Sequence, residues 1–488
     1  MKRIIPFVAS MLFALSAQAQ LINVNLTNGQ TVTYNASQVD YIDFASAKQL
    51  NFTATVNNST GTSIGDVKFT EGDQLLIKGE NVSGVLPITS GAGTTSAVFT
   101  GTLNYTGEGN PASSLALTAT LISSTKVGIN PTTGAADYGT AFCSTVDEAV
   151  AKYCLLTGAG TYGTGEATFS LKPHTAFLNF TATARGPVGK SIEVTVGGLG
   201  SDRTATLTTV EGTSKPVVKF VVPVAEGTAL SGITLKVGKF VASHSISSTA
   251  TAKVYNIDKV MSVVPENIPA GVEWKQLWAG GPYFADRNIG ATSVTDYGDY
   301  FAWGEVEPKT NYVGKTYEWL SVEQYHPNDR RFDYCKYSFA DGETSGIWYE
   351  GDTFIGDGVT TLLPEDDAVY WNWGGDCRMP TASELQALID NTDQEWATID
   401  NVGGYKFMDK NDHSNYIFLP ATGYRTRNYS DYVGLYGYCL SSSLGSTFSG
   451  YGSFLRFRNP EYISTKLLDV HEYYRTYGYT TRAVRTNL

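Results

Sequence analysis

The sequence lacks clusters of lysine and arginine, and its formal net charge is −12. Because proteins that bind nucleic acids usually carry a basic patch or stripe, this composition excludes nucleic acid as an expected partner. Long apolar runs are also scarce. The longest, residues 4–15, is shorter than the roughly 20 apolar residues that a helix needs to span a bilayer. We therefore expect no transmembrane segment.

The motifs of common enzyme classes are missing as well. The chain has no HExxH metal site, no Walker loop, no Gly-x-Ser-x-Gly elbow and no GxGxxG between a strand and a helix. Its five histidines are scattered without the spacing of metal ligands. The sequence therefore predicts no catalytic residues and no cofactor, and an enzyme is the less favoured interpretation.

Cysteine is scarce, with five residues in the chain. In an exported protein these could form two disulfides at most and leave one free thiol. Cys143 and Cys154 lie on either side of a short predicted helix, 146–153, and are the best local candidates for a disulfide. Isolated buried thiols are the alternative, and the sequence alone does not choose between the two.

What is present begins with an export signal. Two basic residues precede the apolar run, and the small-residue pattern Ala17-Gln18-Ala19 follows it. This arrangement is typical of a secretory signal peptide, so we expect residues 1–19 to be removed. The mature protein would then be periplasmic, secreted or displayed on the cell surface. Because no cysteine lies near the cleavage site, a lipoprotein anchor is not expected there.

Regions of different composition follow the signal. Residues 20–47 contain alternating apolar segments around Asn28-Gly29, which predicts a β-hairpin. Residues 48–260 contain no tryptophan and show many short alternating runs between turns, which is typical of one or two β-sandwiches. Two prolines predict a linker near 261–271. Residues 272–488 hold all eight tryptophans and 23 of the 30 tyrosines, so we expect a separate C-terminal domain.

One stretch of the C-terminal region predicts its own local structure. Thr381 followed three residues later by Glu384 is a capping box, and the apolar residues after it fall on one helical face. We expect a short amphipathic helix that ends near residue 391. The aromatic residues at 371–373 predict a buried strand that leads into this helix.

An acidic trio, Glu365-Asp366-Asp367, comes shortly before that stretch. Clustered carboxylates suit Ca²⁺, which prefers oxygen ligands, so these residues are weak candidates for a calcium site. No complete ligand set like an EF-hand loop accompanies them. Turns and local hydrogen bonds are therefore the stronger interpretation.

Aromatic residues are concentrated in two polar, loop-like parts of the C-terminal region. Tyrosine, serine, glycine and arginine together are the composition of adaptable binding surfaces. Such residues can equally fill the core of a fold with few helices, so both interpretations stay open. The candidates for a ligand-binding face are Tyr317, Trp319, Trp348, Tyr349, Tyr429, Tyr432, Tyr436 and Tyr438.

Short motifs relate residues 48–260 to a known family. They are FTEGDQL at 69–75, AVFTG at 97–101, LKPHTAFL at 171–178 and VYNI at 254–257. On these motifs the region resembles the fimbrillin-like proteins, the pilin and pilus-tip family of Bacteroidota. The resemblance implies a β-sandwich fold and a place on a fimbria or at the cell surface. It does not extend to polymerisation by strand exchange, because the lipoprotein cysteine usual in those pilins is missing.

Six ordered motifs run through residues 272–488. They are DYGDYFAWGE at 296–305, LPEDDA at 363–368, RMPT at 378–381, IFLPATGYR at 417–425, SSS at 441–443 and GYTTRAVR at 478–485. On these motifs the region resembles the Fibrobacter succinogenes major paralogous domain, whose C-type-lectin-like scaffold is related to the formylglycine-generating enzymes. The expected fold is mainly β: a fimbrillin-like β-sandwich region followed by an α+β C-type-lectin-like domain.

Two departures from that pattern bear on the chemistry. Cys377 and the segment around Cys439 stand where the family has tryptophans, which implies a second disulfide, Cys377–Cys439, if both sites share one core. The cysteines of this region do not reproduce the active-site pair of the formylglycine-generating enzymes. Because a fold does not transmit its function, we do not expect the scaffold to bring an enzyme activity with it.

The leading hypothesis is an exported, cell-surface or fimbria-associated, non-enzymatic binding protein of adhesin type with a tyrosine-rich, lectin-like head. Its expected partners are surface glycans or proteins of host or bacterial origin, and fimbrial subunits. An enzyme on the formylglycine-generating scaffold and a structural pilin-like subunit are the alternatives. The sequence does not name the ligand.

Overall fold

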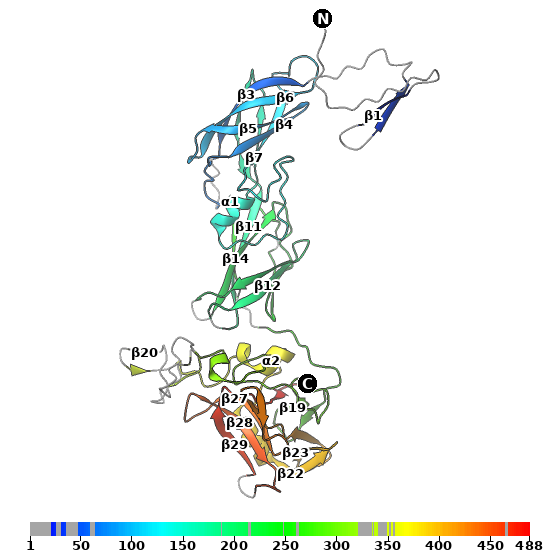
Figure 1. Cartoon of the computed structure of the whole chain (residues 1–488), viewed down its shortest axis with the longest axis vertical. Helices are drawn as coiled ribbons and strands as arrows, with labels where there is room; N and C mark the ends of the chain where they lie inside the picture. Colours follow the sequence, from blue (N-terminus) through cyan, green and yellow to red (C-terminus); the bar gives the residue numbers. More distant parts are fainter. Residues whose placement is uncertain are drawn as a thin grey trace. The chain divides into compact units, whose positions relative to one another are not determined.

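The computed structural model describes residues 21–25, 31–35, 47–58, 64–186, 188–212, 216–246, 248–259, 263–320, 334, 336–339, 349–350, 353–354, 357–463 and 467–488. The described chain is mainly β, as expected from the sequence (Figure 1). It divides into two compact units, residues 1–59 with 68–122 and 157–171, and residues 60–67 with 123–156 and 172–488. Among the described residues, no helix is long and apolar enough to cross a membrane. The expected signal peptide lies outside them.

The predicted N-terminal hairpin is confirmed. Strand β1 (Leu21–Asn25) pairs with β2 (Thr31–Asn35) in antiparallel register, with Val24 opposite Val32. Two short strands joined this closely pair because the loop between them costs little chain entropy. The turn residues 26–30 lie outside the described chain.

The first unit is built on one antiparallel sheet, in which β3 lies beside β6 and β4 beside β7, with β9 added as a parallel edge strand. In β3 the residues Phe52, Ala54 and Val56 are buried and their neighbours face outward, as the two-residue period of a strand requires. The ends of the sheet approach each other, since a Cβ on Gly160 would lie 2.7 Å from the Phe169 ring. The strands, in sheet order, are β8 (Leu156–Thr161), β7 (Ala116–Ile122), β4 (Gln74–Gly79), β5 (Val82–Ser90), β6 (Ser96–Tyr105), β3 (Lys48–Asn57) and β9 (Glu166–Ser170).

The second unit contains a two-sheet sandwich, which we call the middle sandwich. Its inner faces are formed by apolar residues at alternate positions of both sheets, the pattern that packs two sheets face to face. The short strand β10 (Lys172–Pro173) precedes it. One sheet has the order β14 (Val217–Ala225), β11 (Thr175–Thr183), β17 (Val254–Lys259), and the other β13 (Arg203–Thr208), β12 (Ser191–Gly197), β15 (Ile233–Val237), β16 (Phe240–His244).

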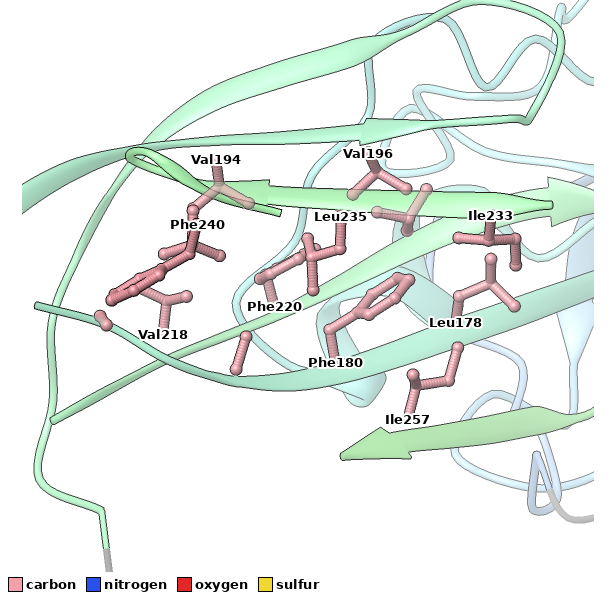
Figure 2. Close-up of a cluster of buried hydrophobic side chains, with 14 of the residues drawn as sticks. Leu178, Phe180, Val194, Val196, Val218, Phe220, Ile233, Leu235, Phe240 and Ile257 are labelled. Atoms are coloured by element: carbon pink, nitrogen blue, oxygen red, sulfur yellow. The ribbon is translucent and has the colours of Figure 1, made fainter. Parts of the chain in front are cut away.

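Figure 2 shows the core of the middle sandwich, in which side chains of the two sheets point toward one another. The rings of Phe180 and Phe220 stack with centroids 4.9 Å apart. The same core takes in Trp371, whose ring meets Phe240 edge-on at 5.2 Å. The middle sandwich and part of the C-terminal region therefore share one apolar core.

Helix α1 (Val146–Tyr153) packs on strands β11 and β14, and the two cysteines of the first candidate disulfide lie before and after it. Cys143 and Cys154, at its two ends, are buried free thiols. Of the two interpretations left open by the sequence, the structure shows isolated buried thiols and not the candidate Cys143–Cys154 disulfide.

The described residues of the C-terminal region, 263–488, form small sheets, two helices and short 3-10 turns. Its three-stranded sheets are β18 (Trp274–Gln276), β19 (Tyr283–Asn288), β30 (Arg482–Arg485); β22 (Thr392–Ile399), β23 (Val402–Asp409), β24 (Tyr416–Pro420); and β27 (Tyr436–Leu444), β28 (Tyr451–Arg458), β29 (Leu468–Tyr474). The remaining elements are β20 (Tyr349–Glu350), β21 (Thr353–Phe354), β25 (Tyr424–Thr426), β26 (Tyr429–Asp431), η2 (Gly314–Thr316) and η4 (Pro364–Asp366).

Two local predictions for this region have different outcomes. Helix α3 (Ala382–Asn391) begins at the predicted capping box: the Glu384 amide donates to Thr381 Oγ1, and the Thr381 amide donates to Glu384 Oε2. The aromatic strand expected at 371–373 is wrong, since these residues form the end of helix α2 (Ala368–Trp373). Asp367 caps that helix by accepting hydrogen bonds from the amides of Val369 and Tyr370.

The second predicted disulfide, Cys377–Cys439, is also wrong. Both residues are free and buried, and they belong to different apolar clusters. Cys377 packs with Trp303 and Trp373, whereas Cys439 packs with residues of α3 and β23. The two sites do not share one core, so the condition for that disulfide is not met. Cys335 lies outside the described residues.

Candidate functional site

A group of contacting tyrosines lies on the sheet β27-β28-β29 and on the segments next to it. Their rings come from β25, from the turn after β26, from all three strands of the sheet, and from the segment after β29. Most of these side chains are partly buried, and two are exposed. We call this group the tyrosine face, and it consists of Tyr424, Tyr432, Tyr436, Tyr451, Tyr473, Tyr474 and Tyr477.

Stacked pairs organise one part of the tyrosine face. Tyr432 and Tyr436 lie with ring centroids 4.7 Å apart and planes at 15°. Tyr424 and Tyr477 stack at 5.5 Å and 17°. The two pairs are joined through Tyr424 and Tyr432, whose centroids are 5.9 Å apart. Aromatic pairs at such distances contribute about 0.5–1.5 kcal/mol beyond the area they bury, so each ring helps to fix its neighbour.

Tyr473 connects Tyr474 and Tyr451 to the stacked pairs of the tyrosine face. Its ring centroid lies 5.8 Å from that of Tyr477, 4.7 Å from Tyr474 and 6.0 Å from Tyr451. Tyr473 remains 36% exposed and Tyr432 remains 49% exposed. These exposed rings are bounded by partly buried ones, so the tyrosine face is a continuous aromatic surface and not a set of isolated side chains.

Buried aromatic residues form the floor beneath the tyrosine face. Tyr479 packs against Phe454 at 4.8 Å and Tyr438 at 5.3 Å, and its ring lies 6.0 Å from that of Tyr424. Tyr438 and Tyr479 are 7% and 1% exposed, respectively. The surface rings therefore stand on a packed layer, which limits how far they can move.

The hydroxyl of Tyr479 is the unusual group of this floor. It is buried and has no hydrogen-bond partner within the described residues. Burial raises the pKa of Tyr479 well above its ordinary value, and the phenols of Tyr438, Tyr424 and Tyr473 raise it further. Burial likewise raises the pKa of Tyr438. These phenols stay neutral in the physiological range, where each hydroxyl can both donate and accept.

Two buried arginines hold the chain segment that carries Tyr477 and Tyr479. The Arg475 guanidinium donates to the backbone oxygens of Tyr337 and Ser449 at 2.7 and 2.9 Å. Arg482 donates to the Ala285 oxygen and, at 2.8 Å, to the Phe418 oxygen. Burial lowers the pKa of Arg482 to about 10, which still leaves it charged. The segment between the two arginines is thereby fixed at both ends.

The structure brings together part of the predicted second group of aromatics. Tyr432 and Tyr436 belong to the tyrosine face, and Tyr438 lies in its floor. Tyr429 is 49% exposed on strand β26, three residues before Tyr432. The assignment of these residues to ligand binding stays a prediction.

The first predicted group has a different placement. Tyr317 and Trp319 are each 3% exposed, so they cannot present a ring to a ligand. The Tyr317 hydroxyl donates to the Trp303 oxygen at 2.6 Å, and the Trp319 indole donates to the Gly304 oxygen at 2.8 Å. The prediction that these two side chains face a ligand is wrong. Both are buried, with their polar groups hydrogen-bonded to backbone oxygens. Tyr349 belongs to strand β20, and Trp348 lies outside the described residues.

The acidic trio supports the structure locally. Asp366 is fully buried, accepts a hydrogen bond from the Tyr337 hydroxyl at 2.5 Å and is paired with Lys336. Asp367 caps α2, and the backbone oxygen of Glu365 accepts from Arg185. Within the part of the chain that the structure describes, no group of three His, Cys, Asp or Glu side chains is placed to hold a metal ion. The stronger interpretation, local hydrogen bonding, accounts for Asp366 and Asp367.

A cavity of about 340 Å³ lies between α2 and the start of α3, and it bears on the enzyme alternative. Cys377 lines it, but the cavity contains no second cysteine and no histidine among the described residues. Burial raises the pKa of Cys377 to about 12, so the thiol is not activated. Arg378, at the same cavity, is engaged in two hydrogen bonds with Glu384. Among the described residues, this cavity therefore holds no cysteine–cysteine or cysteine–histidine pair.

Sequence reasoning missed Tyr473, Tyr474 and Tyr477. They stand in the segment HEYYRTYGYT at 471–480, where four tyrosines occur within seven residues. That local density was the available signal. It could not show that Tyr477 stacks on Tyr424, because the two residues are more than fifty positions apart in the chain.

When the chain was compared with known proteins, only the comparison with solved structures found similarities. No family model and no curated protein matches the chain. A candidate cell-adhesion protein from Bacteroides ovatus aligns with 43% of this chain and 92% of its own, at 10% identity and a TM-score of 0.24. A C-terminally truncated tip fimbrial protein from Porphyromonas gingivalis aligns with 40% of this chain and 81% of its own, at 11% identity and a TM-score of 0.21.

A candidate polysaccharide-binding protein from Bacteroides thetaiotaomicron gives a similar result. It aligns with 38% of this chain and 76% of its own, at 7% identity and a TM-score of 0.23. Scores and identities of this size establish neither a shared family nor a shared function. The fimbrillin-like and lectin-like resemblances therefore stay predictions from the sequence motifs.

Proposed function

We propose that this chain is an exported, non-enzymatic binding protein of adhesin type that works at the cell surface or on a fimbria. The observation that carries the proposal is the tyrosine face. The proposal includes a lectin-like scaffold for residues 272–488 and a stalk or assembly role for residues 48–260, both supported by the sequence motifs of those regions.

The tyrosine face has the properties of a recognition surface. Tyrosine supplies a large, amphipathic contact area with few rotatable bonds, so little side-chain entropy is lost when it binds. Here the rings are also held by one another and by the floor beneath them. Contiguous exposed aromatic surface commonly marks an interaction site on a soluble protein. A core-filling role alone does not explain why Tyr432 and Tyr473 remain exposed.

The test is a binding assay with the mature chain on immobilised mucin, extracellular-matrix proteins and intact bacterial cells. The variants are Tyr432→Ala and Tyr473→Ala, singly and together. Truncation of a central interface tyrosine typically costs at least about 2 kcal/mol, so we expect each variant to weaken binding by roughly thirtyfold.

A matched control is available in the same region. Tyr462 is 69% exposed and has no ring contact with the tyrosine face, so Tyr462→Ala should bind like the wild type. Thermal unfolding of every variant confirms that the fold is kept. Equal binding by the double variant and the wild type on every surface would overturn the proposed function.

A further inference from the structure

The charged side chains beside the tyrosine face have partners within the protein. Arg456 and Asp469 form a two-pronged pair with distances of 2.9 and 2.6 Å. The Glu472 carboxylate accepts from the hydroxyls of Ser446 and Thr447, each at 2.8 Å. These groups cannot serve a charged ligand without giving up their present contacts, which makes ligand ions unfavourable there.

The other charges near the tyrosine face are mixed in sign. Arg458 lies over the ring of Tyr436, with its guanidinium carbon 5.6 Å from the centroid. Asp431 and Arg427, on β26 and the turn before it, carry opposite charges. Because neither sign dominates, the surface is complementary to a neutral ligand and not to a strongly anionic or cationic one.

What the tyrosine face does offer is ring surface together with neutral hydroxyl groups. The face of an aromatic ring is electrically negative and attracts the polarised C–H groups of an apolar ligand face. A phenol hydroxyl can donate one hydrogen bond and accept others. A ligand that fits must therefore have an apolar C–H face and, at its edges, groups that both donate and accept hydrogen bonds.

The buried hydroxyl of Tyr479 adds an independent observation. Tyr479 as a whole is 1% exposed, and its hydroxyl is buried with no partner within the described residues. The ring that carries it lies against those of Tyr438 and Tyr424, with centroids 5.3 and 6.0 Å away, directly beneath the tyrosine face. A buried hydroxyl without a partner is costly, and a ligand hydroxyl that enters between the rings would supply one.

We propose that the tyrosine face binds a neutral carbohydrate without a metal ion, with pyranose rings on the exposed rings of Tyr432 and Tyr473 and sugar hydroxyls hydrogen-bonded to the surrounding phenols. This inference rests on the proposed function and assigns the ligand class of the same site. A pyranose combines a C–H face with hydroxyls at its edge, which matches both parts of the surface. Calcium has no place in this arrangement, since the carboxylates of Asp366 and Asp367 are engaged elsewhere.

The experiment uses the mature full-length chain and defined polysaccharides. Yeast mannan, xyloglucan and galactomannan serve as neutral probes, and heparin and polygalacturonate as anionic ones, in affinity electrophoresis and titration calorimetry. We expect saturable binding to at least one neutral probe, unchanged by EDTA. At about 1 M salt the Debye length is about 3 Å, so binding without ion pairs should persist there.

The variants locate the binding. Tyr432→Ala and Tyr473→Ala should lower the affinity at least about tenfold, whereas Tyr462→Ala should leave it unchanged. Tyr479→Phe removes the buried hydroxyl and keeps the ring, so weaker binding by this well-folded variant would support a hydrogen bond from the floor. Circular dichroism and thermal unfolding verify each fold.

The possible results separate this inference from the proposed function. Binding to anionic probes alone, loss of binding in EDTA or at high salt, or no binding to any polysaccharide by folded protein would overturn the carbohydrate assignment. If the same tyrosines are needed for binding to a protein surface such as deglycosylated mucin, the proposed function stands and the carbohydrate assignment falls. If no binding depends on Tyr432 and Tyr473, both fall.

Discussion

Tyr479 and Tyr300 are both buried in the C-terminal region, but their hydroxyl groups differ in hydrogen bonding. The Tyr300 hydroxyl donates to the Thr422 oxygen at 2.7 Å. The Tyr479 hydroxyl is buried without a partner in the described chain. Since an unsatisfied buried hydroxyl costs about 1–3 kcal/mol, the two residues should respond in opposite directions when the hydroxyl is removed.

We expect Tyr479→Phe to raise the free energy of unfolding by about 1 kcal/mol, because it removes a desolvated polar group and keeps the packed ring. Tyr300→Phe is the matched control and should lower it by about 1 kcal/mol, because it removes a satisfied hydrogen bond and leaves the Thr422 oxygen unpaired. Urea unfolding of both variants measures the difference. A loss of stability in both would show that the Tyr479 hydroxyl has a partner.

At the scale of single residues, the sequence identified tyrosines of the tyrosine face better than it predicted which aromatic side chains are buried. Tyr432 and Tyr436 were identified from composition, and both lie on the tyrosine face. Tyr317 carried the same local signal but is buried, and its hydroxyl accepts from Arg475, which is 158 positions away. Whether a tyrosine in a polar segment turns inward depends on such distant partners. Periodicity and composition do not contain that information.

Helix α2 begins at a buried carboxylate that governs its response to acid. Asp367 accepts from the amides of Val369, Tyr370 and Met379, at 2.8, 3.0 and 2.8 Å. Burial raises the pKa of Asp367 to about 6, and these hydrogen bonds only partly oppose the rise. An unfolded aspartate has a pKa of about 4. Between these values the folded chain binds a proton that the unfolded chain releases.

The contribution of Asp367 to stability should therefore be greatest below about pH 4 and be lost as the pH rises through about 6. The loss is at most about 3 kcal/mol, from two pKa units at 1.36 kcal/mol each. We expect Asp367→Asn, which cannot titrate, to flatten the curve of unfolding free energy against pH in this window.

Asp390→Asn serves as the control for this prediction, since Asp390 is exposed at the end of α3. Its curve should keep the shape of the wild-type curve. Denaturant unfolding from pH 3.5 to 7 gives the comparison. Parallel curves for the wild type and Asp367→Asn would show that Asp367 titrates normally in the folded protein.

Secondary-structure elements that depend on neighbouring residues could be predicted from the sequence. Elements that depend on residues far away in the chain could not. The hairpin β1-β2 and the start of α3 depend on residues within a few positions of each other, and both are confirmed. Residues 371–373 were expected in a strand because two of the three are tryptophan. They are helical because Asp367 caps a turn there, and the core of the middle sandwich accepts the Trp371 ring.

At the scale of the whole second unit, Arg185 joins the middle sandwich to the C-terminal region. It follows β11, and its guanidinium donates to both carboxylate oxygens of Glu318, at 3.0 and 2.7 Å. It also donates to the backbone oxygens of Glu365 and Gly304. Its side chain is 4% exposed, and that of Glu318 is 15% exposed. The composition of the two regions predicted separate folding units and gave no sign of this link.

We expect Arg185→Ala to lower the free energy of unfolding by about 3–5 kcal/mol, because it removes the guanidinium from the buried Glu318 carboxylate, which keeps Lys190 as its only cationic partner among the described residues. Tryptophan fluorescence measures the effect on the C-terminal region, where all eight tryptophans lie. Lys236→Ala, at an exposed position of β15, is the control and should change stability by less than about 0.5 kcal/mol. A change below 1 kcal/mol for Arg185→Ala would mean that the contact contributes little.

The pairing of β30 with β19 also determines when the tyrosine face can form. Arg482, at the start of β30, donates to the Ala285 oxygen of β19 across 197 positions of the chain. Contacts between such distant segments slow folding, because a long loop must close before they form. Tyr473, Tyr474 and Tyr477 lie in the segment just before β30, so they take their places when that segment is added. The proposed ligand binding should therefore appear late and in a single step during refolding, so a bound ligand would report when the C-terminal region is complete.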